Sequence, residues 1–106
     1  MIVVTTENIP GYKVVEVKGP AFGINVRARG IGKDIVASFR SLAGGEIKEY
    51  SALLEDSRRQ SLDRLIQNAT QMGANAVIML RYDSSTIGQG MSEVMAYGTA
   101  VIVEKE

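Results

Sequence analysis

The stretch RGIGKD, residues 29–34, is the part of the sequence that comes nearest to a phosphate-binding loop. In the G-x-x-x-x-G-K-[ST] pattern, glycines let backbone N–H groups surround the phosphates, and the hydroxyl residue after the lysine holds Mg²⁺. Here Arg27 occupies the place of the first glycine, and Asp34 stands where the hydroxyl residue belongs. We therefore predict a solvated turn ahead of a helix, where Lys33 could at most attract an anion.

Two arginines and several carboxylates are the other residues whose types could do chemistry. Arg27 and Arg29 alternate on a stretch expected to be extended, so their side chains share a face. They could bind an anionic ligand, although a subunit salt bridge or plain solvent exposure is the favoured interpretation. The carboxylates of a long predicted helix could include a catalytic pair or a hard-metal site, but their favoured role is to form the solvated side of that helix. These carboxylates are Glu46, Glu49, Glu55, Asp56 and Asp63.

The sequence contains no cysteine and no histidine. This excludes a disulfide framework and catalysis by a Cys or Ser nucleophile with a His base, and it argues against a structural zinc site. Lys plus Arg and Asp plus Glu both number 12, so the chain lacks the basic excess typical of nucleic-acid binders. We expect no cofactor and no nucleic-acid partner, and the balance is against an enzyme.

Length and composition indicate one domain over residues 1–106. Hydrophobic residues make up 45% of the chain and charged residues 23%, the usual balance for a soluble globular protein. The first residues, MIVVTTENIPGYK, have no basic region and no long apolar core, so we expect no signal peptide. No apolar run approaches the roughly 18 residues that span a bilayer. A cytoplasmic protein without membrane contact is the resulting expectation.

The expected elements alternate between extended and helical segments in a simple order. Residues 2–6 and 12–18 predict strands, with Pro10-Gly11 as a type II turn between them and a bend or bulge at residues 19–23 before the chain extends again. Helical spacing predicts a short helix within residues 32–45 and a long one over Glu46 to Met72, ended by Gly73. Ser57 and Ser61 on its apolar stripe would permit close packing. Strands are predicted at 74–83 and 91–104, joined as a hairpin. The order favours a two-layer α+β fold with a small antiparallel sheet packed on the long helix plus the short helix.

The last two predicted strands carry apolar side chains on both faces. Small residues on one face of the last strand, Ala96, Gly98 and Ala100, would let a helix sit close. The opposite face then holds apolar side chains that one helix cannot cover, and each one left in water forgoes roughly 1.5–3 kcal/mol of burial: Val77, Met79, Met95, Tyr97, Val101 and Val103. A patch of this kind usually marks an interface, so we predict a homo-oligomer, with a closed ring as one form. The alternative is that the short helix covers part of the patch.

Three segments taken together resemble the YbjQ family of small bacterial proteins: AGGEIKEYSALLEDSRRQSLDRL, MGANAVIMLRYD and AYGTAV. The resemblance covers nearly the whole chain. It implies an α+β subunit similar to the dodecin-like one, assembly into pentameric rings, no established biochemical role and no known catalytic residues. The family also carries a label of heavy-metal binding. Soft metals want thiolate or imidazole, and this chain offers only oxygen donors and Met thioethers, so we expect the label not to apply here.

Polar residues at the family's motif positions complete the candidate sites. We predict that Glu49 and Tyr50 hydrogen-bond at a subunit boundary and that Asn75 satisfies backbone groups at the turn into the next strand. The tyrosines Tyr82 and Tyr97 are expected in the core or an interface. The candidate interface or ligand contacts are Arg27, Arg29, Glu49, Tyr50, Asn75, Val77, Met79 and Tyr97.

The favoured function is a non-enzymatic homo-oligomer that binds a small molecule or a partner protein, and the resemblance implies that it is a pentamer. The alternatives are a metal-binding protein that uses oxygen ligands and an enzyme with its sites at subunit junctions.

Overall fold

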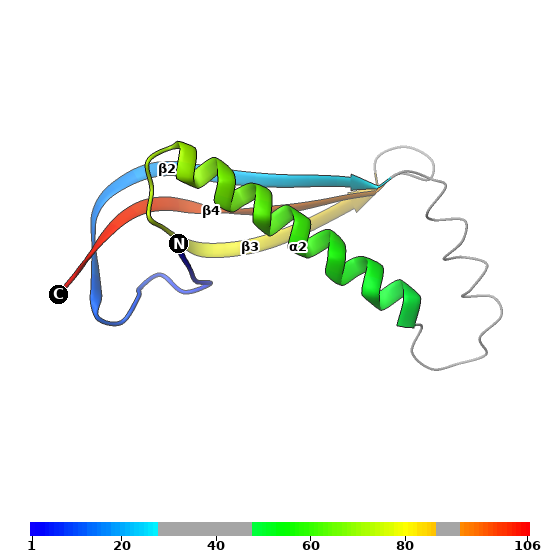
Figure 1. Ribbon diagram of the computed structural model, residues 1–106, viewed down its shortest axis with the longest axis horizontal. Helices are drawn as coiled ribbons and strands as arrows, with labels where there is room; N and C mark the ends of the chain where they lie inside the picture. Colours follow the sequence, from blue (N-terminus) through cyan, green and yellow to red (C-terminus); the bar gives the residue numbers. More distant parts are fainter. Residues whose placement is uncertain (28–47, 87–91) are drawn as a thin grey trace.

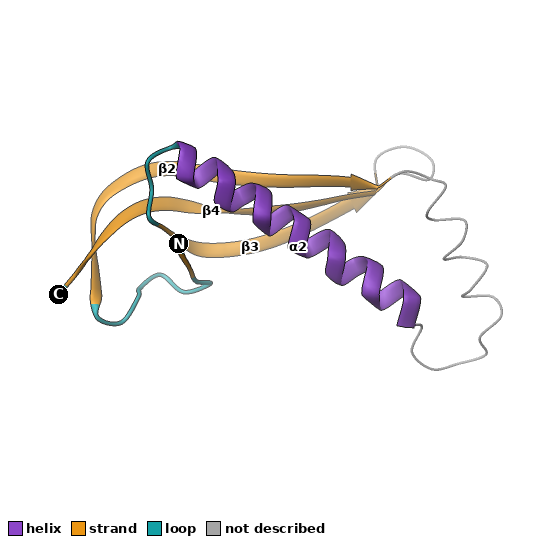
Figure 2. Cartoon of the chain, viewed as in Figure 1, coloured by secondary structure: helices purple, strands orange, loops and turns teal. Residues whose placement is uncertain are grey.

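The structure, a computed structural model, describes residues 1–27, 48–86 and 92–106. These residues form one helix and four strands: β1 (Ile2–Val3), β2 (Tyr12–Arg27), α2 (Lys48–Gln71), β3 (Ala76–Thr86) and β4 (Ser92–Lys105). The strands make a single sheet in the order β1-β3-β4-β2. The helix α2 lies obliquely across one face of this sheet (Figure 1, Figure 2), which confirms the predicted two-layer α+β architecture. The short helix predicted within residues 32–45 lies outside the described residues.

The sheet is mixed, so the prediction of an antiparallel sheet was wrong at one edge. Antiparallel pairs join β4 to both β2 and β3, as the predicted hairpin requires, but β1 runs parallel to β3. The first residues follow the outer edge of β3, where Val4 N donates to Val77 O and Leu80 N donates to Val4 O. The N-terminal segment thereby satisfies edge groups of β3 that water or another chain would otherwise have to bind.

The predicted turn and helix stop are both confirmed. Gly11 has a φ of 81°, and Tyr12 N donates to Ile9 O at 3.1 Å, as in a type II turn with Gly at its third position. Gly73 has a φ of 87° after the last helical turn. Its N–H bonds Thr70 O, and the next N–H bonds Ala69 O, which is the Schellman arrangement. The helix therefore ends where the sequence predicted, and the chain turns directly into β3.

The backbones of α2 and β2 touch at Gly23. A Cβ atom added there would lie 2.0 Å from Ser61 O and 2.4 Å from Leu65 N, so only a glycine fits. Ser57 and Ser61, which were predicted to permit close packing, are both buried on the side of α2 that faces the sheet. Ser61 Oγ donates to Val94 O at 2.8 Å. The predicted bend in β2 is also present, as a register shift between Val17 and Gly19.

Gly98 was expected to let α2 approach the sheet, but the atoms nearest to it belong to the strand β3. A Cβ at Gly98 would lie 2.7 Å from Val77 Cγ1 and 3.0 Å from Ile78 O, which belong to the adjacent strand β3. There β3 carries a bulge between Ile78 and Arg81, and Met79 has a φ of 57°. Gly98 therefore makes room for the bulge, while Ala96 and Ala100 are buried in the cluster under α2 as predicted.

On the side of the sheet away from α2, the apolar side chains at one end are covered by other residues of the same chain. Val101 and Val103 are buried with Ala76, and the residues packed against them come mostly from the N-terminal segment: Ile2, Ile9, Tyr12 and Ile78. Val77 is fully buried on the helix side. The prediction that Val77, Val101 and Val103 form an uncovered patch was therefore wrong. Val77 belongs to the cluster under α2, and the segment before β2 folds across Val101 and Val103.

None of the described residues covers the other end of the same side. On β2, Ala21, Gly23 and Asn25 are buried under α2, while the alternating Phe22, Ile24 and Val26 are 47%, 43% and 44% exposed. The first two lie opposite Tyr97 and Met95 of β4 in the sheet register. We call this surface the open face, and its apolar residues are Phe22, Ile24, Val26, Met95 and Tyr97.

Candidate functional site

A pocket of about 180 Å³ lies between the N-terminal half of α2 and the strands β3 and β4. Leu54 and Arg58 stand one turn apart on α2, so both side chains point to the same side of the helix. Tyr82 and Ser84 alternate on β3 and lie opposite the buried Ala96 and Val94, which places them on the helix side of the sheet. The described residues that line the pocket are Leu54, Arg58, Tyr82, Asp83, Ser84 and Val94.

Two side chains of the pocket, Arg58 and Tyr82, interact as a cation above an aromatic ring. The Arg58 guanidinium carbon lies 5.9 Å from the centroid of the Tyr82 ring, within the range of a cation–π interaction. Tyr82 is 39% exposed, and its partial burial raises the pKa of the phenol; the positive charge of Arg58 opposes this shift and the negative charge of Asp63 adds to it. Asp83 Oδ1 accepts the Ser84 N–H at 2.9 Å. Tyr82 is therefore a neutral donor at physiological pH, with a fixed positive charge beside it.

We expect the Tyr82 phenol to ionise at a higher pH than an exposed tyrosine, whose pKa is about 10. Because the folded-state pKa is raised, the stability that this group contributes is complete below pH about 10 and is lost as pH rises through the folded-state pKa. The measurement is the phenolate absorbance of the protein minus that of Tyr82→Phe. Arg58→Gln should move the Tyr82 titration further upward, since it removes the nearby positive charge. A titration at or below that of a free tyrosine amide would contradict the assignment.

The residues predicted from sequence do not gather at this pocket. Asn75 acts as predicted on backbone groups: its side chain donates to Val103 O at 2.9 Å and accepts from Val103 N at 2.8 Å, which ties the start of β3 to β4. Met79 is exposed at the bulge of β3, and Tyr97 belongs to the open face. Arg27 ends β2, and Glu49 and Tyr50 lie in the first turn of α2; Arg29 lies outside the described residues. The proposed interface or ligand roles of these residues stay predictions.

Sequence reasoning missed Arg58 as a site residue and assigned Tyr82 only to the core or an interface. They are 24 positions apart, on a helix and a strand, and neither belongs to a motif. The available signal was the four-residue spacing of Leu54 and Arg58, an apolar and a basic residue on one stripe of the helix.

Comparisons with known proteins identify the family. Residues 1–104 match the model of the YbjQ family, which is described as "Putative heavy-metal-binding". A UPF0145 protein of Bradyrhizobium sp. (strain ORS 278) is 60% identical over 104 residues, covering 98% of this chain and 94% of that protein. The chain belongs to the YbjQ family. A second member of the UPF0145 proteins, from Pyrococcus furiosus, is 52% identical over 106 residues and is covered to 93% of its length.

A solved structure supports the same fold for this member of the YbjQ family. It is a protein of unknown function of the DUF74 family from Pediococcus pentosaceus, with a TM-score of 0.65, 18% sequence identity and 98% coverage of both chains. At this identity the likeness shows the fold alone. Among the described residues, the helix α2 is too polar to serve as a membrane span.

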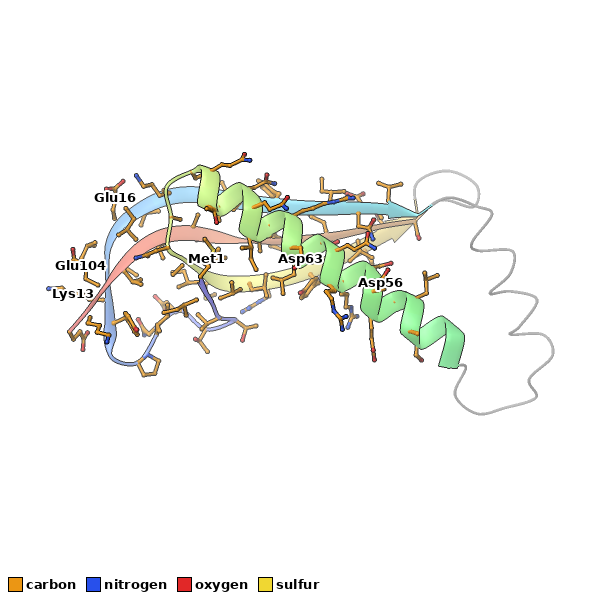
Figure 3. The ribbon with its side chains drawn as sticks, in the orientation of Figure 1. Met1, Lys13, Glu16, Asp56, Asp63 and Glu104 are labelled. Atoms are coloured by element: carbon orange, nitrogen blue, oxygen red, sulfur yellow. The ribbon has the colours of Figure 1, made fainter. Side chains whose placement is uncertain are left out.

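The donor atoms that this chain can offer a heavy metal are oxygens and Met thioethers. The sequence has no thiolate or imidazole to offer a soft metal. Among the described residues, no three carboxylates stand close enough to share an ion. Figure 3 shows their separation: Glu16 and Glu104 lie at one end of the sheet, and Asp56 and Asp63 lie along α2.

Proposed function

We propose that the protein is a non-enzymatic homo-oligomer whose subunits cover one another's open face, and that the assembly binds a small ligand or a partner. The observation that carries this proposal is the row of exposed apolar side chains on the edge strand β2 and on its neighbour β4. Phe22 lies directly opposite Tyr97, and Ile24 lies opposite Met95. Opposed residues of neighbouring strands have Cβ atoms about 4.5–5.5 Å apart, so these four form one continuous surface.

The energy available from covering this surface is large for a chain of 106 residues. Full burial of a large apolar side chain contributes roughly 1.5–3 kcal/mol relative to exposure. The open-face residues are already about half covered, so each gains a part of that value. Together they still provide several kcal/mol, on the scale of a small domain's whole net stability of about 5–15 kcal/mol.

The shape of the subunit supports another copy of the chain as the occupant. Its radius of gyration is 17.0 Å, with extents of 54 × 27 × 16 Å, whereas a compact domain of about 100 residues has a radius of about 13 Å. In this elongated, thin subunit the described residues leave the open face about half exposed. Identical elongated copies, each with the same open face, can supply the cover for one another.

Contact through the face of the sheet is favoured over addition of a strand at its edge. The edge strand β2 has two carbonyls already bound by α2: Arg64 Nη1 donates to Ile24 O, and Asn68 Nδ2 donates to Phe22 O at 2.6 Å. A strand added there would displace these donors. We further propose a closed ring of dodecin-like subunits, five being the number that the resemblance to the family implies.

Sedimentation velocity and native mass spectrometry of the full chain at micromolar concentration test this proposal. We expect a defined multiple of the 11.5 kDa subunit mass. The multiple should persist at high salt, because burial of apolar surface is not screened as ion pairs are. A monomer at micromolar concentration would overturn the proposal.

A further inference from the structure

We propose that the pocket between α2 and β3 binds a small organic anion, a carboxylate or phosphate attached to an apolar group no larger than a single ring. The described residues that line it come from one subunit, so the inference does not depend on the proposed assembly.

Arg58 supplies the charge for this ligand. Among the described side chains, Lys18 and Glu16 form an ion pair, and Arg58 forms none. Its guanidinium rests over the Tyr82 ring, an arrangement that limits the rotamers of a long side chain before any ligand arrives. A guanidinium offers five N–H donors in a planar fork that matches two oxygens of a carboxylate or phosphate.

Hydroxyl donors stand beside this cation. Tyr82 and Ser84 both line the pocket from the helix side of β3. The Tyr82 phenol keeps its proton at physiological pH, since its ordinary pKa of about 10 is already far above that pH and partial burial raises it further, so it can donate a hydrogen bond to an anion. Asp83 is the one carboxylate among the described lining residues, and it alternates with them on the strand, opposite Met95 of the open face. The Oδ1 atom of Asp83 accepts a hydrogen bond from the Ser84 N–H.

The apolar part of the ligand is defined by Leu54, Val94 and the available space. Leu54 is 42% exposed and Val94 is 9% exposed, so the helix and the sheet each present a hydrocarbon wall. The pocket volume is about 180 Å³, and an apolar cavity of about 150 Å³ is known to hold benzene. A benzoate-sized molecule therefore fits, with its ring on these walls and its charged group at Arg58.

Titration of the full chain with sodium benzoate, followed by amide chemical shifts in NMR spectra, tests the inference. Phenyl phosphate is the second anionic probe and benzyl alcohol the neutral one. We expect saturable shifts confined to the pocket residues with either anion, and the tighter of the two identifies the preferred charged group. Benzyl alcohol should bind at least about tenfold more weakly, because it lacks the charge that Arg58 receives.

Two variants and one control make the test specific. Arg58→Gln should weaken benzoate binding by about tenfold or more, and Tyr82→Phe should weaken it by several-fold while keeping the ring. Arg59→Gln removes the same charge from the next, also exposed, position of α2, and it should leave the affinity unchanged. Equal weakening in Arg58→Gln and Arg59→Gln, equal binding of benzyl alcohol, or an absence of saturable shifts would each overturn the inference.

Discussion

Gly23→Ala is expected to lower the free energy of unfolding by about 3 kcal/mol or more, enough to leave much of the protein unfolded. The added Cβ would lie 2.0 Å from Ser61 O, 2.4 Å from Leu65 N and 3.0 Å from Leu65 Cα. All three are backbone atoms, so no change of rotamer relieves the overlap. The helix must move away from β2, and the bond from Ser61 Oγ to Val94 O is lost with it.

Urea denaturation followed by circular dichroism measures this effect, and Gly11→Ala is the matched control. Gly11 has a φ of 81°, but no atom lies within 4 Å of an added Cβ. Its replacement should cost only the backbone strain of a left-handed alanine, about 1–2 kcal/mol. Similar losses in the two variants would show that α2 and β2 do not touch as closely as described.

Local signals predicted the parts of the fold that depend on neighbouring residues. Pro10-Gly11 and Gly73 mark a turn and a helix end through backbone geometry alone, and both features are present. The alternation of small residues in β4 predicted the face that lies under the helix, and Ala96 and Ala100 are buried there. In each case the cause acts within a few residues of the chain.

Contacts between distant segments could not be predicted in the same way. Alternation showed that β3 and β4 are apolar on both faces, but it did not show that Ile2 and Ile9 cover Val101 and Val103. The parallel pairing of β1 with β3 has the same origin, since strand propensity does not select a partner. Of the predicted patch, Met79 and Tyr97 are exposed, but the other exposed apolar residues of the open face, Phe22, Ile24 and Val26, are on β2, which the predicted interface did not include.

The candidate pocket illustrates this limit most clearly. Its charged and aromatic groups, Arg58 and Tyr82, meet only because α2 crosses the sheet obliquely (Figure 1). The helix backbone approaches the sheet most closely at Gly23, 35 positions before Arg58. The spacing of residues along the helix does not predict the angle at which the helix crosses the sheet.

The open face provides the prediction with the largest expected effect on assembly. Ile24→Lys should convert the oligomer to a monomer while leaving the far-ultraviolet circular dichroism spectrum unchanged. Ile24 is 43% exposed in the subunit, so a lysine there stays in water and costs the fold little. In the assembly the ammonium group would be buried without a partner, and this is expensive enough to raise the dissociation constant of each contact at least about a hundredfold.

The symmetry of a homo-oligomer multiplies this effect, because one substitution alters every subunit contact at once. Ile24→Val is the matched control: it shortens the side chain by one methylene and keeps it apolar, so the oligomer should survive with its mass unchanged. Sedimentation velocity of the two variants at equal concentration separates the outcomes. If Ile24→Lys sediments with the parent oligomer, the subunits associate through another surface, and the apolar row on β2 and β4 has a different occupant.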